Sequence, residues 1–225
     1  YYIYIELKIK NLIFINSERN RIMDFNNKYY TDLSVLHIGC EAPRAYFIPY
    51  ESHSSAYKDN RAASNKFFTL CGDWNFLYFR SVKCLPDFTA EDFNIGNNKL
   101  TVPMSWQADL GKGYDTPNYT NINYPFPVIP PFVPDDNPCG LYQRHFFVDS
   151  EMLEKEIYIN FEGVDSCFYL YINNEFAAYS QVSHMTSEID ITRFLHVGNN
   201  DIKVLVLKWC DGSYLEDQDK FRFSG

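Results

Sequence analysis

The sequence predicts an all-β fold, an antiparallel β-sandwich of the jelly-roll kind that is preceded by an extended amino-terminal arm. The first observation is the aromatic content: 18 Tyr, 19 Phe and 3 Trp among 225 residues. Aromatic side chains are enriched in strands because they fit a pleated, half-buried surface. The second is a series of short strand-like runs, separated by turn residues, without any long helical period. We expect helix only as short turns, near residues 151–155 and 191–195.

Clear strand-like runs begin at residue 141. Residues 141–148 read LYQRHFFV, and residues 157–161 place three large apolar side chains on one face. Alternation with a period of two is typical of a strand that turns one face toward a core. We therefore expect both segments to be strands, with His145 in the first of them packed or hydrogen-bonded in the core.

A hairpin is predicted around Asn173 and Asn174. Residues 168–172 alternate between apolar and tyrosine side chains, and residues 175–180 supply a second strand. Asparagine tolerates the left-handed backbone conformations that a two-residue hairpin turn requires.

The segment IKVLVLKW, residues 202–209, is apolar on both faces, as expected of a central strand covered on each side. Residues 198–200 (GNN) are expected to form the turn that leads into it. In contrast, residues 125–134 (PFPVIPPFVP) contain five prolines. Proline lacks a backbone donor and fixes φ, so this segment is expected to be an extended crossing segment rather than a strand or helix.

Three parts are predicted along the chain. Residues 1–22 begin with YYIYIELKIKNLIFIN, whose apolar runs are interrupted by charges, so they resemble neither a membrane span nor a signal peptide. A more ordinary stretch begins at Met23, and we interpret residues 1–22 as a non-native or fragment-edge leader. The arm then covers residues 23–60, and the sandwich covers residues 61–225.

Charge and cysteine spacing exclude several function classes. A formal net charge of −9 argues against nucleic acid as a partner. No two of the six cysteines form a C-x-x-C pair, which argues against a zinc knuckle or a redox motif. We expect them to be buried free thiols rather than a disulfide framework. Without a signal peptide or a membrane span, the expected location is cytoplasmic.

Several stretches from residue 67 onward occur in a specific order and spacing. They read FTLCGDWNF from Phe68, VPMSWQ from Val102, GYDTPNYTN from Gly113, PPFVP from Pro130, FEGVDSCF from Phe161 and WCDGSYLEDQDKFRFSG from Trp209. Together they resemble the amino-terminal, galactose-binding-domain-like jelly roll of glycoside hydrolase family 2, most closely in the large β-galactosidases of the bacterial lactose-utilisation type. The resemblance is strong over residues 67–225 and loose over residues 29–50.

The resemblance implies a parent enzyme that hydrolyses terminal β-D-galactosides such as lactose with retention. In the family, an immunoglobulin-like domain, a catalytic (β/α)₈ barrel and further β domains follow this one. Retention requires two carboxyl groups about 5–5.5 Å apart, and barrel enzymes carry such groups at the ends of barrel strands. Because no barrel is encoded here, we expect no catalytic residue in this chain, and we interpret the acidic loop with Glu216 and Asp217 as a turn or cation site.

Two residues of this chain match substrate-binding positions of the family. Asp219, the last residue of D-Q-D, matches one that contacts the galactosyl group and helps to hold a sodium ion. Asn121, in Y-T-N, matches one that hydrogen-bonds the substrate. A carboxylate accepts from sugar hydroxyls and binds hard cations, and an amide both donates and accepts. Without the resemblance, the first is a surface acid and the second a turn residue.

The resemblance also implies a structural magnesium site. Gln181 and Asp211 match its ligands, and oxygen donors of this kind suit magnesium. Asp32 in the arm matches a weaker third ligand, because Tyr29 stands where the family has an acid. Sodium and magnesium are both expected in the context of the full-length enzyme.

The expected partners are a β-galactoside, the remaining domains of the same enzyme and, for the parent, further copies in a homo-oligomer; no membrane partner is expected. Three alternatives stay open. One is another activity of the family, β-glucuronidase or β-mannosidase, although the long motifs favour β-galactosidase. The chain could be a freestanding, non-catalytic carbohydrate-binding module, since jelly rolls often bind sugars. It could also serve a structural role, in which the arm helps to assemble subunits.

Overall fold

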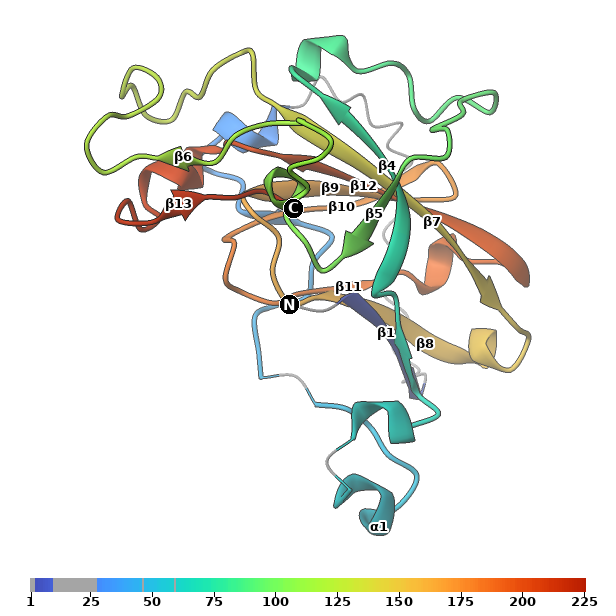
Figure 1. Ribbon diagram of the computed structural model, residues 1–225. Helices are drawn as coiled ribbons and strands as arrows, with labels where there is room; N and C mark the ends of the chain where they lie inside the picture. The colour runs from blue at the N-terminus through green and yellow to red at the C-terminus, as the bar shows by residue number, and fades with distance from the viewer. Residues whose placement is uncertain (1–2, 10–27, 46, 59) are drawn as a thin grey trace.

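The protein folds as an antiparallel β-sandwich, seen here in a computed structural model that describes residues 3–9, 28–45, 47–58 and 60–225. Its two main layers are a seven-stranded and a four-stranded sheet, and a small third sheet lies at one end (Figure 1). The predicted all-β sandwich is thereby confirmed. The larger sheet has the order β2 (His37–Ile38), β10 (Glu175–Gln181), β9 (Cys167–Ile172), β12 (Gly198–Leu207), β7 (Cys139–Val148), β4 (Gly72–Phe79), β5 (Lys99–Val102).

The remaining described strands form two smaller sheets. The four-stranded sheet has the order β11 (Ser187–Asp190), β8 (Lys155–Phe161), β1 (Ile3–Ile9), β3 (Phe67–Thr69). The third sheet pairs β13 (Phe221–Arg222) with β6 (Asn118–Tyr119). Described helix is limited to one α-helical turn and short 3-10 turns, as predicted: α1 (His53–Ala56), η1 (Tyr29–Thr31), η2 (Arg61–Ala63), η3 (Val82–Cys84), η4 (Trp106–Ala108), η5 (Met152–Glu154), η6 (Thr192–Phe194), η7 (Asp211–Tyr214).

The strands and the hairpin predicted in the second half are present. β9 and β10 are joined at Asn173 and Asn174, whose φ values of 50° and 67° are the left-handed conformations that the turn requires. The five-proline segment is neither strand nor helix, and an isolated bridge between Ile129 and Phe132 is its only described ladder contact.

Two expectations about single positions are wrong. Residues 198–200 are not a turn, because β12 already begins at Gly198, where it pairs with Val148 of β7. His145 is a mid-strand residue, but its side chain is 60% exposed and approaches the Asp201 carboxylate at 3.4 Å.

The first strand lies inside the sandwich. β1 pairs with both β8 and β3, and Tyr4, Ile5 and Leu7 are buried. The sandwich therefore reaches beyond the predicted boundary at residues 61–225. Residues 10–27, which include most of the predicted leader, lie outside the described residues, and the leader interpretation of residues 1–22 stays a prediction.

The arm carries little regular structure. Its described residues between 28 and 66 form only η1, β2, α1 and η2 (Figure 1). Several contacts tie it to the sandwich, among them the packing of η1 against η7. β2 adds a short edge strand to β10, and Arg44 binds the buried Glu188 carboxylate of β11 through two nitrogens, each at 2.9 Å.

The seven-stranded sheet is buried on both of its faces. One face packs against the four-stranded sheet through aliphatic and aromatic side chains such as Phe76, Leu170 and Val204. The other face is covered by the arm and by the long connection over residues 80–138, with Tyr169 and Leu205 in its core. This double coverage explains why the sequence of β12 is apolar on both sides.

Buried polar groups tie the long connection to β12 and the residues that follow it. Lys203 Nζ donates to the Phe88 carbonyl at 3.0 Å, and Lys208 Nζ donates to Asp115 Oδ2 at 2.6 Å. Among the described residues, the cysteines are all free thiols, as expected, but only three of the six are buried. None of the described helices has the length and apolar character needed to cross a membrane.

Candidate functional site

Two loops that are about 100 positions apart in the chain meet at the third sheet. β6 pairs with β13 in the register Phe221↔Tyr119, and the two strands lie side by side at one end of the molecule (Figure 1). The pairing places Asn121, two residues after β6, next to Asp219, two residues before β13. The structure thus brings together the two residues that the sequence predicts to contact substrate.

Asp219 is held by two hydrogen bonds to one oxygen. The Tyr119 hydroxyl donates to Oδ1 at 2.5 Å, and Asn121 Nδ2 donates to the same atom at 3.2 Å. Asn121 Nδ2 also lies 3.2 Å from the Tyr119 hydroxyl. We call Tyr119, Asn121 and Asp219 the carboxylate triangle. Its side chains offer the acceptors and donors that sugar hydroxyls bind.

The loop behind the triangle is fixed by further polar contacts. Thr120 Oγ1 donates to Gln218 Oε1 at 2.7 Å, and Gln218 Nε2 donates to the Ser213 carbonyl at 3.2 Å. Arg222 is buried and donates to the same carbonyl at 2.8 Å, and it also binds the Glu216 carboxylate. Glu216 is therefore part of a structural ion pair. Asp217 accepts the Asp219 amide at 2.9 Å and so shapes the turn.

The triangle stands on an open surface. Asn121 and Asp219 are both exposed, and apolar side chains project around them, with Ile122 79% exposed and Leu215 90% exposed. A sugar placed here would meet protein on one side only. The arrangement can bind hydroxyl groups or a cation, but the described residues around it do not enclose a substrate.

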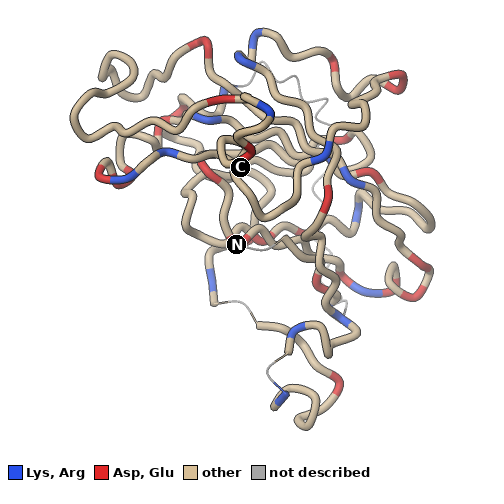
Figure 2. Tube along the Cα trace, viewed as in Figure 1, with Lys and Arg blue, Asp and Glu red and all other residues tan. Residues whose placement is uncertain are grey.

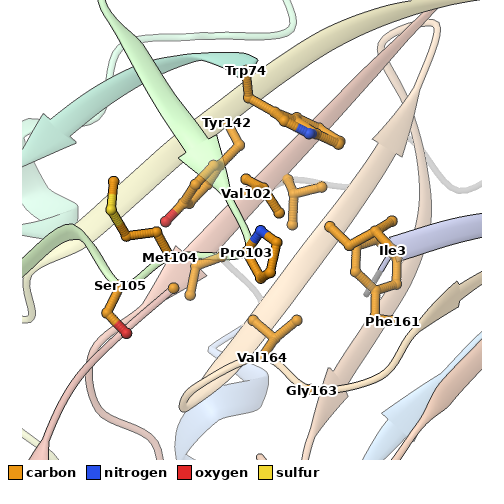
Figure 3. Close-up of a pocket in the computed structure, with 13 residues that line it drawn as sticks. Ile3, Trp74, Val102, Pro103, Met104, Ser105, Tyr142, Phe161, Gly163 and Val164 are labelled. Atoms are coloured by element: carbon orange, nitrogen blue, oxygen red, sulfur yellow. The ribbon is translucent and has the colours of Figure 1, made fainter. Parts of the chain in front are cut away.

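A cavity in the described part of the chain lies elsewhere. It measures about 330 Å³ and opens between the two main sheets, with Trp74 and Tyr142 on one side and Ile3 and Phe161 on the other (Figure 3). Its lining is mostly apolar, and none of the predicted site residues contributes to it. An apolar cavity does not supply the several polar groups that a sugar requires.

The predicted magnesium ligands also lie together. η1, which precedes Asp32, packs against η7, which begins at Asp211. Burial raises the pKa of Asp211, and the neighbouring Asp32 raises it too, whereas contacts with Gln181 and the Gly212 amide lower it. Gln181 is buried, and its amide oxygen accepts from the Tyr179 hydroxyl at 2.8 Å.

The residues at this second place fit a hard cation. Asp211 Oδ2 is buried and accepts no hydrogen bond from any described residue, which is costly unless a positive partner is present. The Gln181 oxygen has a second lone pair available besides the one used by Tyr179. Clusters of three or more His, Cys, Asp or Glu side chains are absent from the described ranges. A site here would therefore use two carboxylates, an amide and water, as magnesium often does.

Sequence reasoning missed Tyr119 and Arg222 as members of the site. Tyr119 lies inside the Y-T-N segment that identified Asn121, and Arg222 follows the D-Q-D segment that identified Asp219. Both residues lie in or next to the quoted motifs, but a motif match assigns a role only to the positions that match functional residues of the family. The contact between Tyr119 and Asp219 depends on the pairing of β6 with β13. Each of these strands has two residues, which is too short for a recognisable pattern in the sequence.

The described residues carry charges of both signs. Figure 2 shows acidic and basic residues interspersed over the described chain, rather than basic residues gathered on one side.

Comparison with known proteins connects this chain to one enzyme family. The family model described as "Glycosyl hydrolases family 2, sugar binding domain" matches residues 67–225. A β-galactosidase of Actinobacillus pleuropneumoniae is 48% identical over 198 residues, and one of Staphylococcus xylosus is 44% identical over 199 residues. Each match covers 88% of this chain and 19% of the relative. The chain thus spans about a fifth of the length of these relatives.

Solved structures agree on the fold. The crystal structure of a Bacteroides uniformis β-glucuronidase superposes with a TM-score of 0.51 at 19% identity, covering 69% of this chain and 16% of that one. A calcium-binding mutant of β-glucuronidase 2 from the same organism gives 0.50 at 17% identity. At these identities the likeness concerns the sandwich alone.

Proposed function

The chain belongs to glycosyl hydrolase family 2, as its sugar-binding domain, and on that premise we propose that it is the amino-terminal part of a retaining β-galactosidase. The proposed parent hydrolyses terminal β-D-galactosides such as lactose. In it, this domain supplies substrate and cation contacts to a catalytic barrel that these residues do not include. The identities of 48% and 44% to proteins named β-galactosidase support this choice of substrate within the family.

The observation that carries the proposal is the position of Asn121 beside Asp219. Their side chains come from loops 98 residues apart and are hydrogen-bonded to each other, yet both are exposed. Side chains that contact a substrate from one side only bind it effectively when another part of the protein encloses the other sides of the substrate. We infer that the Asn121 amide binds a sugar hydroxyl and that the Asp219 carboxylate binds the galactosyl group and a sodium ion.

A second cation completes the proposal. We infer that Asp211, Gln181 and, more weakly, Asp32 hold magnesium, which would stabilise the junction between the arm and η7. The buried Asp211 oxygen without a hydrogen-bond partner supports this assignment. Magnesium here has a structural role, because none of its proposed ligands belongs to the carboxylate triangle.

The decisive test is substitution of the triangle in the full-length protein. Asp219→Asn and Asn121→Ala should each lower kcat/KM for a nitrophenyl β-galactoside by about tenfold to a hundredfold, because each removes a hydrogen bond that involves a charged or polar substrate contact. Asp92→Asn, which changes an exposed carboxylate in the connection after β4, is the matched control and should leave kcat/KM unchanged.

Two results would contradict the proposal. One is a full-length protein that cleaves β-galactosides equally well with and without Asp219. The other is tight sugar binding by the isolated 225-residue chain: calorimetric titration with galactose should give no dissociation constant below about 1 mM, since one wall supplies too little contact. Sub-millimolar binding would favour a freestanding carbohydrate-binding module.

The magnesium assignment has its own measurement. Adding magnesium at about a hundred times its dissociation constant should stabilise the folded state by about 2.7 kcal/mol, seen as a higher unfolding temperature than in a chelator. Asp211→Asn should abolish this difference, and Asp92→Asn should keep it. If magnesium stabilised the Asp211→Asn variant equally, the magnesium site would not be formed by Asp211, Gln181 and Asp32.

A further inference from the structure

We propose that Tyr119 is a positioning residue, which fixes one oxygen of Asp219 so that the other oxygen is presented to the incoming sugar or cation. The inference rests on the proposed function of Asp219 and adds to it a residue that neither the motifs nor the comparisons assign. The hydroxyl of Tyr119 acts through the carboxylate and makes no substrate contact of its own in this role.

The hydrogen bonds on Asp219 are unevenly distributed. Both Tyr119 and Asn121 donate to Oδ1, at 2.5 and 3.2 Å, and no described residue donates a hydrogen bond to Oδ2. A carboxylate whose two oxygens were equally free would rotate about its terminal bond. Two donors on one oxygen set that rotation and leave the lone pairs of the second oxygen available.

The ring of Tyr119 is itself held in place. Its centroid lies 5.6 Å from that of Phe221, with 46° between the ring planes, and the two residues are direct partners in the β6–β13 register. Cross-strand aromatic pairs of this kind stabilise the pairing and fix side-chain direction. The rigid ring therefore carries the hydroxyl from β6 to a carboxylate in the loop that precedes β13, a distance that a serine side chain could not span.

The same hydroxyl also orients the second substrate-binding group. Asn121 Nδ2 lies 3.2 Å from the Tyr119 hydroxyl as well as 3.2 Å from Asp219. With its amino group directed into the triangle, the amide presents its oxygen outward. One hydroxyl thus organises both groups that contact the sugar.

A positioning role predicts a change in binding rather than in the chemical step. In the full-length protein, Tyr119→Phe keeps the ring against Phe221 and removes only the hydroxyl. We expect about a tenfold rise in KM for 2-nitrophenyl β-D-galactoside, because the lost bond involves a charged group. The sodium concentration for half-maximal activity should rise similarly, and kcat should change by less than about twofold.

The matched control is Tyr158→Phe. It also removes a tyrosine hydroxyl that donates to a carboxylate, that of Glu156 at 3.3 Å, but in the four-stranded sheet. It should leave KM, kcat and the sodium dependence unchanged. A rise in KM in this variant equal to that of Tyr119→Phe would mean that loss of any such hydroxyl loosens the domain, and it would overturn the assignment.

A double-mutant cycle separates this inference from the function on which it rests. If Tyr119 acts through Asp219, adding Tyr119→Phe to Asp219→Asn should raise KM little beyond the single Asp219 change. Additive effects would overturn the positioning role even if Tyr119→Phe also lowers stability. If Asp219→Asn alone leaves activity and sodium dependence unchanged, the proposed function fails instead. If Asp219→Asn weakens binding and Tyr119→Phe does not, only the positioning role fails.

Discussion

The two faces of the seven-stranded sheet are buried in different ways. The face toward the four-stranded sheet is filled by aliphatic side chains, Phe and Trp, with Tyr142 as the one tyrosine among the buried residues of that cluster. The face under the loops buries four tyrosines and three cysteines among its core residues. Strand β9 shows the contrast within one segment, since Phe168, Leu170 and Ile172 belong to the first cluster, whereas its alternate residues Cys167, Tyr169 and Tyr171 belong to the second.

The difference follows from what covers each face. A sheet satisfies its own backbone groups, so the residues between two sheets only need to be apolar and well packed. Loops contain backbone amides and carbonyls that are not paired within a sheet. The side chains packed beneath the loops therefore need polar groups that can hydrogen-bond to this backbone. The loop-covered face is also where Asp211 and Gln181 lie. We conclude that packing fixes the sandwich and polar contacts fix the loops that carry the site.

Truncation of the core between the sheets should have the largest effect. Phe76 is fully buried, and its ring lies 4.7 Å from Tyr142 and 5.1 Å from Tyr114, centroid to centroid. Phe76→Ala should lower the free energy of unfolding by about 3–5 kcal/mol through lost burial and the cavity left behind. Phe132→Ala, which changes an exposed ring in the proline-rich segment, should stay within about 0.5 kcal/mol.

Urea unfolding of both variants measures this difference. The midpoint should shift for Phe76→Ala while the dependence on urea stays the same. A loss equal to that of Phe132→Ala would show that the inter-sheet core does not carry the stability assigned to it here.

A polar contact under the loops should have the next largest effect. Asn137 is fully buried, its Nδ2 donates to the Trp209 carbonyl at 2.7 Å, and its Oδ1 accepts the Trp209 amide at 3.0 Å. Asn137→Ala leaves two buried backbone groups unsatisfied and should lower the free energy of unfolding by about 2–3 kcal/mol. Asn94→Ala removes only an exposed turn contact to the Gly96 amide and should cost less than about 0.5 kcal/mol.

A second substitution at the same position sharpens the comparison. Asn137→Leu keeps the branching of the side chain at Cγ, with a somewhat larger volume, and removes its polar atoms. If polar contacts hold the loop-covered face, leucine should destabilise at least as much as alanine, by the same urea measurement. Recovery of stability in the leucine variant would mean that both faces depend on apolar packing alone.

This contrast also explains how far the sequence could predict the structure. β7, β8, β9, β10 and β12 were predictable because a period of two, or a run apolar on both sides, follows directly from their burial. The turn at Asn173 was predictable because few residues adopt its conformation. The start of β12 at Gly198 was not, since a Gly-Asn-Asn segment favours a turn wherever it occurs. Pairing with β7 overrides that local preference.

The candidate site was predictable only through its motifs. Asn121 and Asp219 are exposed polar residues in loops, and without the resemblance nothing in their spacing indicates that they meet. Their contact depends on the pairing of two strands of two residues each, and strands this short show no recognisable alternation in the sequence. The place of β1 in the small sheet likewise depends on long-range pairing with β8, which a local pattern of alternation cannot specify.

The reactivity of the cysteine thiols gives the finest comparison between exposed and loop-covered positions, because it can be measured in the protein without any substitution. Cys84 is exposed, whereas Cys139, Cys167 and Cys210 are buried under the loops. Burial raises the pKa of Cys139 far above its ordinary value, and burial raises that of Cys40 to about 11. Since the thiolate is the nucleophile, iodoacetamide at pH 8 should modify Cys84 first, with the sites resolved by mass spectrometry of peptides. The Cys40 rate should still rise about tenfold per pH unit between pH 8 and 10, below its pKa.

The buried thiols then report whether the two faces unfold together. If the loops and the sandwich form one cooperative unit, the three thiols under the loops should react only as fast as global unfolding allows, and Phe76→Ala should accelerate all of them equally. If the loops open separately, the same thiols should react in the intact protein before urea unfolds it, and Asn137→Ala should accelerate them more than Phe76→Ala does. Because polar contacts fix the loops and packing fixes the sandwich, we expect the second pattern, with Cys210, next to Trp209, responding most to the loss of Asn137.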